Sequence, residues 1–199
     1  MRALPSRKPS ALILAAGAST RFGTPKQLAK LWRKTLLQRA IASVPASSVR
    51  ETVVVIGHAA SAVRESIDGE PVKVVVNQDY RAGLSSSIRK GVASLSPDTP
   101  GVLLLLADQP LVTKTLLRGM LELFAKKDAI LAASAGGVAS PPVIFPRRYF
   151  DELQALSGDK GAKEVIERHR GELLRVPAAP KKTLADIDTQ DDIRAARKG

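Results

Sequence analysis

The stretch GVLLLLADQP, residues 101 to 110, decides the class of fold. Its first seven residues carry no polar side chain, so the segment does not alternate between a buried and a solvated face. Such a continuous apolar run is typical of a central strand in a parallel sheet that helices cover on both faces. Polar residues follow at once, beginning with Asp108, and open α/β sheets bind ligands at the carboxyl ends of their strands. The stretch therefore predicts a buried strand that ends at a polar site.

Outward from this strand, strand-like and helix-like segments alternate along the chain. The order predicts a three-layer α/β fold, in which a doubly wound, mostly parallel sheet lies between two layers of helices. We expect a single domain over residues 10–199, preceded by a flexible tail over residues 1–9. Ser85 is the expected cap of the third helix. The expected strands are residues 11–16, 52–56, 72–76, 101–107, 128–133, 143–145 and 173–176, and the expected helices are residues 35–44, 59–67, 85–95, 113–125, 147–156, 160–170 and 189–197.

The composition excludes several kinds of protein. The 199 residues include no cysteine and two histidines, which rules out disulfides, thiolate metal sites and cysteine nucleophiles. A metal here would be held by oxygen ligands, and this favours Mg²⁺. No apolar run approaches the roughly 20 residues that span a bilayer, and the N-terminus lacks the apolar stretch of a secretory signal. We therefore expect a cytoplasmic protein that does not enter the membrane.

A formal net charge of +12 favours partners that carry negative charge. Nucleic acid is disfavoured, because the basic residues are scattered among acidic ones and only 4% of residues are aromatic and able to stack on bases. A phosphorylated small molecule is compatible with the excess, and a solvated basic surface would produce the same count.

The loop LAAGASTRFGTPKQ, residues 14 to 27, has the composition of a phosphate-binding turn. Gly17 permits a tight turn, and the small residues after it leave backbone N–H groups open to an anion. Arg21 and Lys26 add two positive charges, so the loop is suited to a triphosphate. It matches neither the Walker A pattern nor GxGxxG, and an ordinary strand-to-helix turn with solvated Arg and Lys is the alternative.

Three further motifs offer polar groups that could join this loop. Asp108 is suited to holding Mg²⁺, or alternatively to capping the helix that follows it. The segment NQDYRAGLSSS, residues 77 to 87, offers a glycine and three serines as donors to a ribose, base or phosphate. The segment ADIDTQDD, residues 185 to 192, places Asp186 and Asp188 before the last helix, as metal ligands or as charges that the helix dipole favours.

Taken together and in this order, the motifs resemble the molybdopterin nucleotidyltransferases, and within them the molybdenum cofactor cytidylyltransferases. The resemblance implies a nucleotide-diphospho-sugar-transferase-like fold. It also implies a Mg²⁺-dependent reaction in which CTP gives its CMP group to the terminal phosphate of the molybdopterin cofactor and pyrophosphate is released. It extends over roughly residues 11 to 195, and it is carried by the first loop, LADQP at 106–110, GLSS at 83–86, SGDKGAK at 157–163 and DIDTQDD at 186–192.

The resemblance also assigns roles to residues of this sequence. Arg21, Lys26 and Asp108 would be catalytic, and Asp108 and Asp188 would hold Mg²⁺. Ala15-Ala16-Gly17 and LADQP match the cytidylyl branch rather than the guanylyl branch, which implies CTP. Ser140-Pro141-Pro142 stands where the family usually has Gly-His-Pro, so the donor is better defined than the acceptor. By the resemblance, the nucleotide-binding residues are Ala15, Ala16, Gly17, Ser19, Arg21 and Lys26, and to these we add Leu14, Gly83, Ser85 and Ser86 of the same motifs. Ser140 and Pro142 are expected to line the acceptor side. Lys160 and Lys163, at a helix start, are candidates for binding the acceptor's phosphate, and a solvated helix terminus is the alternative.

Other functions are open on the same residues. The scaffold could transfer CMP, GMP or UMP to a sugar phosphate or another phosphorylated alcohol. A non-enzymatic molybdenum cofactor carrier, which hands the pterin to an apo-molybdoenzyme, would not need Arg21, Lys26 and Asp108. A basic nucleic-acid-binding module would show an affinity that falls steeply with salt.

Overall fold

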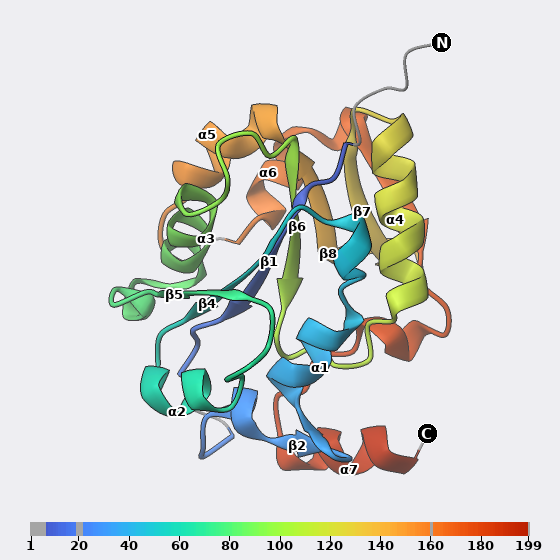
Figure 1. The fold of residues 1–199 in the computed structure, drawn as a ribbon. Coiled ribbons are helices and arrows are strands. Elements are labelled where there is room, and N and C mark those ends of the chain that lie inside the picture. The colour runs from blue at the N-terminus through green and yellow to red at the C-terminus, as the bar shows by residue number, and fades with distance from the viewer. Residues whose placement is uncertain (1–6, 19–21, 160, 199) are drawn as a thin grey trace.

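The computed structural model describes residues 7–18, 22–159 and 161–198 (Figure 1). Three predicted site residues, Ser19, Arg21 and Lys160, lie outside the described residues. The main sheet has seven strands, which are β1 (Ser10–Ala15), β4 (Thr52–Ile56), β5 (Lys73–Val76), β6 (Gly101–Leu106), β7 (Ile130–Ala135), β8 (Val138–Pro146) and β9 (Leu173–Pro177).

The strand order is β5-β4-β1-β6-β8-β7-β9, so β6 lies at the centre of the sheet as its apolar sequence predicts. The strands β5, β4, β1 and β6 form a parallel half. In the other half, β8 is antiparallel to both β6 and β7, and β9 is parallel to β7 at the edge. The central strand therefore has one parallel and one antiparallel neighbour. The mostly parallel sheet of the predicted α/β fold is confirmed.

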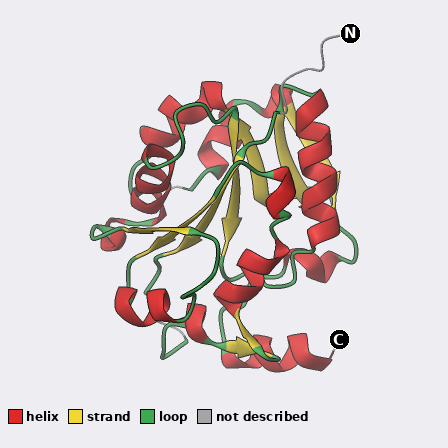
Figure 2. Ribbon diagram, in the orientation of Figure 1, coloured by secondary structure: helices red, strands yellow, loops and turns green. Residues whose placement is uncertain are grey.

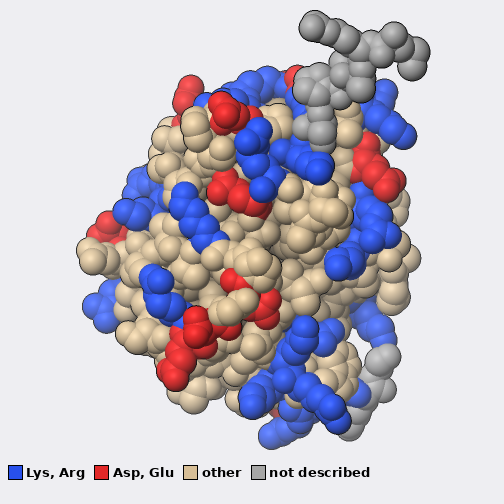
Figure 3. Space-filling view, viewed as in Figure 1, with Lys and Arg blue, Asp and Glu red and all other residues tan. Residues whose placement is uncertain are grey.

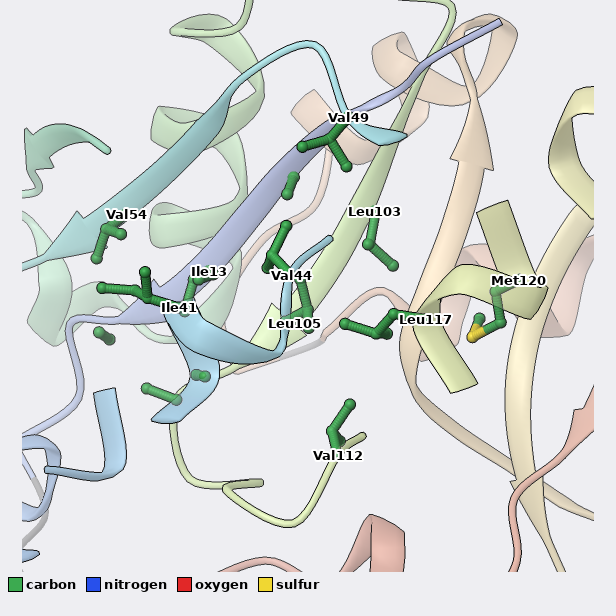
Figure 4. Close-up of a cluster of buried hydrophobic side chains, with 14 of the residues drawn as sticks. Ile13, Ile41, Val44, Val49, Val54, Leu103, Leu105, Val112, Leu117 and Met120 are labelled. Carbon is green, nitrogen blue, oxygen red and sulfur yellow. The ribbon is translucent and has the colours of Figure 1, made fainter. Parts of the chain in front are cut away.

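Helices cover both faces of this sheet, which gives the predicted three layers (Figure 2). Successive side chains of a strand point to opposite faces, so Ile13 and Leu103 enter one core while Leu12 and Leu104 enter the other. Figure 4 shows the first core, where Ile41 lies beside Ile13. The first core is covered by α1 (Leu36–Ser43), α2 (Ala60–Glu65) and α4 (Lys114–Lys126), and the second by α3 (Leu84–Ala93), α5 (Phe150–Gln154) and α6 (Lys163–Arg168).

A third, smaller cluster closes the end of the molecule toward which the arrowhead of β6 points (Figure 1). It joins the first loop to a hairpin of β2 (Lys30–Leu31) and β3 (Lys34–Thr35) and to the C-terminal helix α7 (Gln190–Lys198). The hairpin was not predicted, because strands of two residues show no periodicity. The cluster brings the C-terminal helix next to the first loop, and its buried members are Phe22, Leu31, Leu36, Ile187 and Ile193.

The strand predicted over residues 143–145 is longer than expected. It begins at Val138 and passes through two prolines, which cannot donate to a ladder. On the facing strand, Ala132 pairs with Val143 and the adjacent Ala133 pairs with Ser140, so an irregularity accommodates both prolines. Pairing with β6 extends only over residues 143–146, so the prolines lie beyond that ladder.

Helix starts also differ from the sequence prediction, most instructively at α3 and α6. Helix α3 begins at Leu84 with Gly83 as its N-cap, so the predicted cap Ser85 is wrong. Gly83 has a φ of +93°, which a residue with a Cβ rarely adopts, and it therefore sets the start of the helix. The helix predicted over residues 160–170 spans only α6, because glycines at 158 and 161 disfavour an earlier start.

On the face drawn in Figure 3, basic side chains are spread among acidic ones. On the face shown, they gather most densely at the end where β2 and α7 lie. Arg7, within the predicted N-terminal tail, forms an ion pair with Asp128. Among the described residues, no helix has the length and apolar character that crossing a membrane requires.

Candidate active site

The loops that follow β1 and β6 lie side by side, because these strands are parallel neighbours. The N–H of Ala107 donates to the carbonyl oxygen of Leu14 at 3.1 Å and joins the start of the second loop to the end of β1. A cavity of about 390 Å³ opens beside them, which we call the donor cavity. Its described lining contains eight predicted site residues, Leu14, Ala15, Ala16, Gly17, Lys26, Gly83, Asp108 and Asp188, together with Gln27, Tyr80, Leu84, Ser87, Leu106, Ala107 and Asp159.

Lys26 lies between the two predicted metal ligands. Its Nζ is 2.7 Å from Oδ2 of Asp108 and 2.9 Å from Oδ1 of Asp188. The three residues come from the first loop, the end of β6 and the segment before α7. Partial burial lowers the pKa of Lys26, but attraction to the two carboxylates outweighs this effect and raises the pKa above its ordinary value. Lys26 is therefore a fixed cation at neutral pH.

Asp108 also offers an oxygen that is suited to a metal ion. Its Oδ1 is buried and has no hydrogen-bond partner among the described residues. Leaving such an atom without a donor is unfavourable, and a hard cation such as Mg²⁺ prefers carboxylate oxygens. The residues present therefore fit Mg²⁺ that takes its other ligands from substrate phosphates and water. The described part of the chain holds no group of three or more His, Asp or Glu side chains able to bind a metal ion.

The alternative role of Asp108, capping the next helix, is wrong. The hydroxyl of Thr113 caps α4 by accepting a hydrogen bond from the N–H of Leu116 at 3.2 Å.

Asp186, the first carboxylate of ADIDTQDD, has a raised pKa, because desolvation and then the charge of Asp108 disfavour its ionised form. A hydrogen bond from Gln109 opposes this effect.

Gln27 is a buried residue of the donor cavity that the sequence did not single out. Its Nε2 donates to the carbonyl oxygens of Ala15 at 3.0 Å and Gly17 at 2.7 Å. Both carbonyls belong to the first loop, so Gln27 fixes the backbone that is predicted to bind the triphosphate. An amide next to Lys26, in a loop of small residues, is the only sequence signal for this role.

The serines after Gly83 have mainly structural partners. Ser85 donates to the carbonyl of Gly158 at 2.6 Å and Ser86 to the carbonyl of Gly83 at 2.8 Å. Both serines are buried, and neither belongs to the described lining of the donor cavity, whereas Ser87 does. Their predicted contact with a nucleotide therefore stays a prediction. At Gly83 a Cβ would lie 2.5 Å from the carbonyl oxygen of Gly158, so a side chain cannot fit.

The segment before α7 is held by a dense set of hydrogen bonds. The N–H of Ile187 donates to the carbonyl oxygen of Asp108 at 2.8 Å. Oδ2 of Asp192 accepts from the N–H of Asp188 at 3.0 Å, the N–H of Thr189 at 2.7 Å and the hydroxyl of Thr189 at 2.9 Å. These bonds, led by that from the hydroxyl, lower the pKa of Asp192.

A second cavity, of about 620 Å³, adjoins the donor cavity, and we call it the acceptor cavity. Leu84 and Leu106 line both cavities. Of the predicted acceptor residues, Ser140 and Lys163 line it, whereas Pro142 is not part of its described lining. The remaining wall is largely aliphatic, with charged side chains from Glu167, Arg170 and Arg175; its aliphatic members include Ile88, Leu104, Val138, Val143, Ile166 and Leu173.

A doubly wound sheet, with a lysine and two carboxylates gathered beside the carboxyl ends of its central strands, is the arrangement of an α/β protein that binds a polar ligand at this edge. Comparison with protein families agrees with this class. The model of the MobA-like NTP transferase domain matches residues 11–173, and the chain belongs to that family. The predicted resemblance to molybdopterin nucleotidyltransferases is thereby confirmed at the level of the family.

Three relatives illustrate the range of the family. Rv0371c of Mycobacterium tuberculosis H37Rv shares 31% identity and a TM-score of 0.83 over 96% of this chain and 99% of its own, and a second structure of Rv0371c is a complex with manganese. Nicotine blue oxidoreductase of Paenarthrobacter nicotinovorans is 29% identical over 92% of this chain and 93% of its own. Bifunctional protein GlmU of Syntrophomonas wolfei is 29% identical over 67% of this chain, and the matched region covers 30% of the length of GlmU.

Proposed function

We propose that the chain transfers the CMP group of CTP to the terminal phosphate of the molybdopterin cofactor and releases pyrophosphate. The observation that carries the proposal is that a charged cavity and a largely apolar cavity lie next to each other and share lining residues. The donor cavity holds Lys26, Asp108 and Asp188, and it shares Leu84 and Leu106 with an apolar acceptor cavity. Membership of an NTP transferase family supports the donor half of the reaction.

In the proposed reaction, an oxygen of the acceptor phosphate bonds to the α-phosphorus of CTP, and the bond from that phosphorus to the β-phosphate oxygen breaks. A phosphate nucleophile is already ionised at neutral pH, so the reaction needs no general base. Lys26, with Arg21 of the same loop, stabilises the charge that collects on the leaving pyrophosphate. Asp108 and Asp188 would hold Mg²⁺, which would supply positive charge to neutralise the phosphates.

The acceptor cavity favours a flat heteroaromatic acceptor over a sugar phosphate. A sugar needs several polar partners for its hydroxyl groups, because unpaired buried hydroxyls are unfavourable. The described wall is mostly aliphatic, and Ser140 is the one neutral polar side chain in this described lining. Lys163, Arg170 and Arg175 supply positive charge for the acceptor's phosphate. The flat faces of the pterin ring of molybdopterin can pack on the aliphatic wall, and its phosphate suits the three cations.

The proposed preference for CTP rests on Ala15 and Ala16. Both line the donor cavity, and the Ala16 side chain is packed against the position of Gly57. The side chains of Ala15 and Ala16 are buried in the first and second cores, so they hold the loop backbone in place beside the cavity, and this restricted backbone is what would favour a pyrimidine over the larger guanine. We expect CTP to exceed GTP by at least about tenfold in kcat/KM, roughly 1.4 kcal/mol. Ala16→Gly alone should do little, whereas combining it with changes at Leu106 and Gln109 should erode the preference.

Sugar-phosphate transfer is the second candidate, because two GlmU relatives match 67% and 55% of this chain. A panel of CTP, GTP, UTP and ATP against molybdopterin and several sugar phosphates, scored by pyrophosphate release, separates the candidates. We expect release with CTP and molybdopterin. Release with a sugar phosphate alone would replace the acceptor, and a preference for GTP would replace the donor. No release from any pair would favour a carrier, or a redox role as in the name of the Paenarthrobacter relative.

A further inference from the structure

One hydrogen bond at the start of α7 exceeds what the helix needs. Thr189 and Asp192 form a reciprocal capping box, in which the N–H of Asp192 donates to Oγ1 of Thr189 at 3.2 Å and Oδ2 of Asp192 accepts the N–H of Thr189 at 2.7 Å. The same Oδ2 also accepts the N–H of Asp188 at 3.0 Å, one residue before the cap. This additional bond fixes the backbone of a residue whose carboxylate contacts Lys26.

The other side of Asp188 is fixed as well. The N–H of Ile187 donates to the carbonyl oxygen of Asp108 at 2.8 Å. The Ile187 side chain is buried with Ile193 of α7 in the third cluster. Asp188 therefore lies between two anchors, one on the loop after β6 and one on α7. With both anchors in place, the direction of its Cα–Cβ bond is set by the backbone.

We propose that Asp192 is a positioning residue, which orients Asp188 toward the metal site of the donor cavity. The proposal rests on the proposed function, because it takes Asp188 as a metal ligand. Partners that orient a ligand in this way commonly change metal affinity by 10–100-fold when they are removed. Asp192 itself needs no contact with the metal or the nucleotide.

The adjacent Asp191 provides a matched control. It carries the same charge on the same helix, but it is exposed and pairs with Arg194 three residues further on. Asp192→Asn tests geometry against charge, because all three accepted bonds use one oxygen and an amide oxygen can take its place. Thr189→Ala weakens the helix cap while leaving the bond between Asp188 and Asp192.

The test measures the affinity of the protein for Mn²⁺ without nucleotide by electron paramagnetic resonance, which requires no turnover and no bound CTP. Asp192→Ala should weaken Mn²⁺ binding by about tenfold or more. Asp192→Asn, Asp191→Ala and Thr189→Ala should each stay within about threefold of the unmodified protein. The proposal is overturned if Asp192→Ala binds Mn²⁺ normally, if Asp191→Ala weakens binding equally, or if Thr189→Ala reproduces the whole effect.

Amide hydrogen exchange without metal gives a second readout. In Asp192→Ala the N–H groups of Asp188 and Thr189 should exchange faster, while residues of β6 keep their protection. Unchanged exchange at Asp188 would contradict the positioning role. Failure of the proposed function is distinguishable, because it would appear as absent pyrophosphate release while Mn²⁺ binding and hydrogen exchange still report on Asp192.

Discussion

The two cavities that meet at Leu84 and Leu106 are built differently. The donor cavity lies at the ends of parallel strands, and its charged groups are joined across 82 and 162 residues of chain by contacts of Lys26 with Asp108 and Asp188. The acceptor cavity extends under α6 and along β8, and its wall is mostly aliphatic. In the proposed reaction, charge stabilisation would depend on the fixed geometry of the first cavity, while shape and a few cations would select the acceptor in the second.

The largest effect should come from removing one charge of the donor cavity. Asp108→Asn keeps the shape of the side chain but weakens metal binding, so turnover should fall on the order of a thousandfold, about 4 kcal/mol. Steady-state pyrophosphate release measures this loss. Asp98→Asn, an exposed aspartate, is the control and should be unaffected. Turnover within a few-fold of normal in Asp108→Asn would remove Asp108 from the mechanism.

Lys26→Met should lower turnover on the order of a hundredfold, about 3 kcal/mol, because the leaving pyrophosphate loses a cation. It should also lower the free energy of unfolding by about 1 kcal/mol in EDTA, since two carboxylates then face each other without a positive charge. Added Mg²⁺ should restore part of that stability. Lys30→Met, on the exposed hairpin, serves as the control. Equal stability of Lys26→Met with and without Mg²⁺ would argue against a metal between Asp108 and Asp188.

Gln27→Leu tests whether the loop geometry of the donor cavity depends on buried hydrogen bonds. The carbonyls of Ala15 and Gly17 lose their donor, so the free energy of unfolding should fall by about 2 kcal/mol. The KM for CTP should rise as well, while the KM for the acceptor should not. Gln154→Leu, on the exposed side of α5, should change stability by no more than about 0.5 kcal/mol. Denaturant unfolding and steady-state kinetics decide the outcome.

The smallest effect is expected on the acceptor side. Lys163→Ala removes one exposed cation from the wall, so the KM for the acceptor should rise about fivefold, near 1 kcal/mol, with the KM for CTP unchanged. Lys126→Ala, at the end of α4, should change neither constant. A rise in the KM for CTP instead would show that Lys163 serves the donor cavity.

The sequence predicted those parts of the molecule that depend on a continuous pattern. The apolar run at 101–107 predicted the central strand, and parallel neighbours then placed the Gly17 loop beside Asp108. Interactions between distant side chains left no local pattern. Gln27 and Asp192 act through bonds to backbone groups, and such bonds follow from the fold rather than from residue type. The prolines of β8 obscured a strand that continues through an irregularity in its pairing with Ala132 and Ala133.

The central claim is that the donor cavity transfers a nucleotidyl group to a substrate in the neighbouring apolar cavity. The most direct test incubates the protein with molybdopterin, Mg²⁺ and CTP labelled at the α-phosphorus or, separately, at the γ-phosphorus. We predict that the α label appears in the molybdopterin product and the γ label in pyrophosphate, in equal amounts. Transfer of the γ label to the acceptor, or recovery of both labels in intact CTP, would contradict the account.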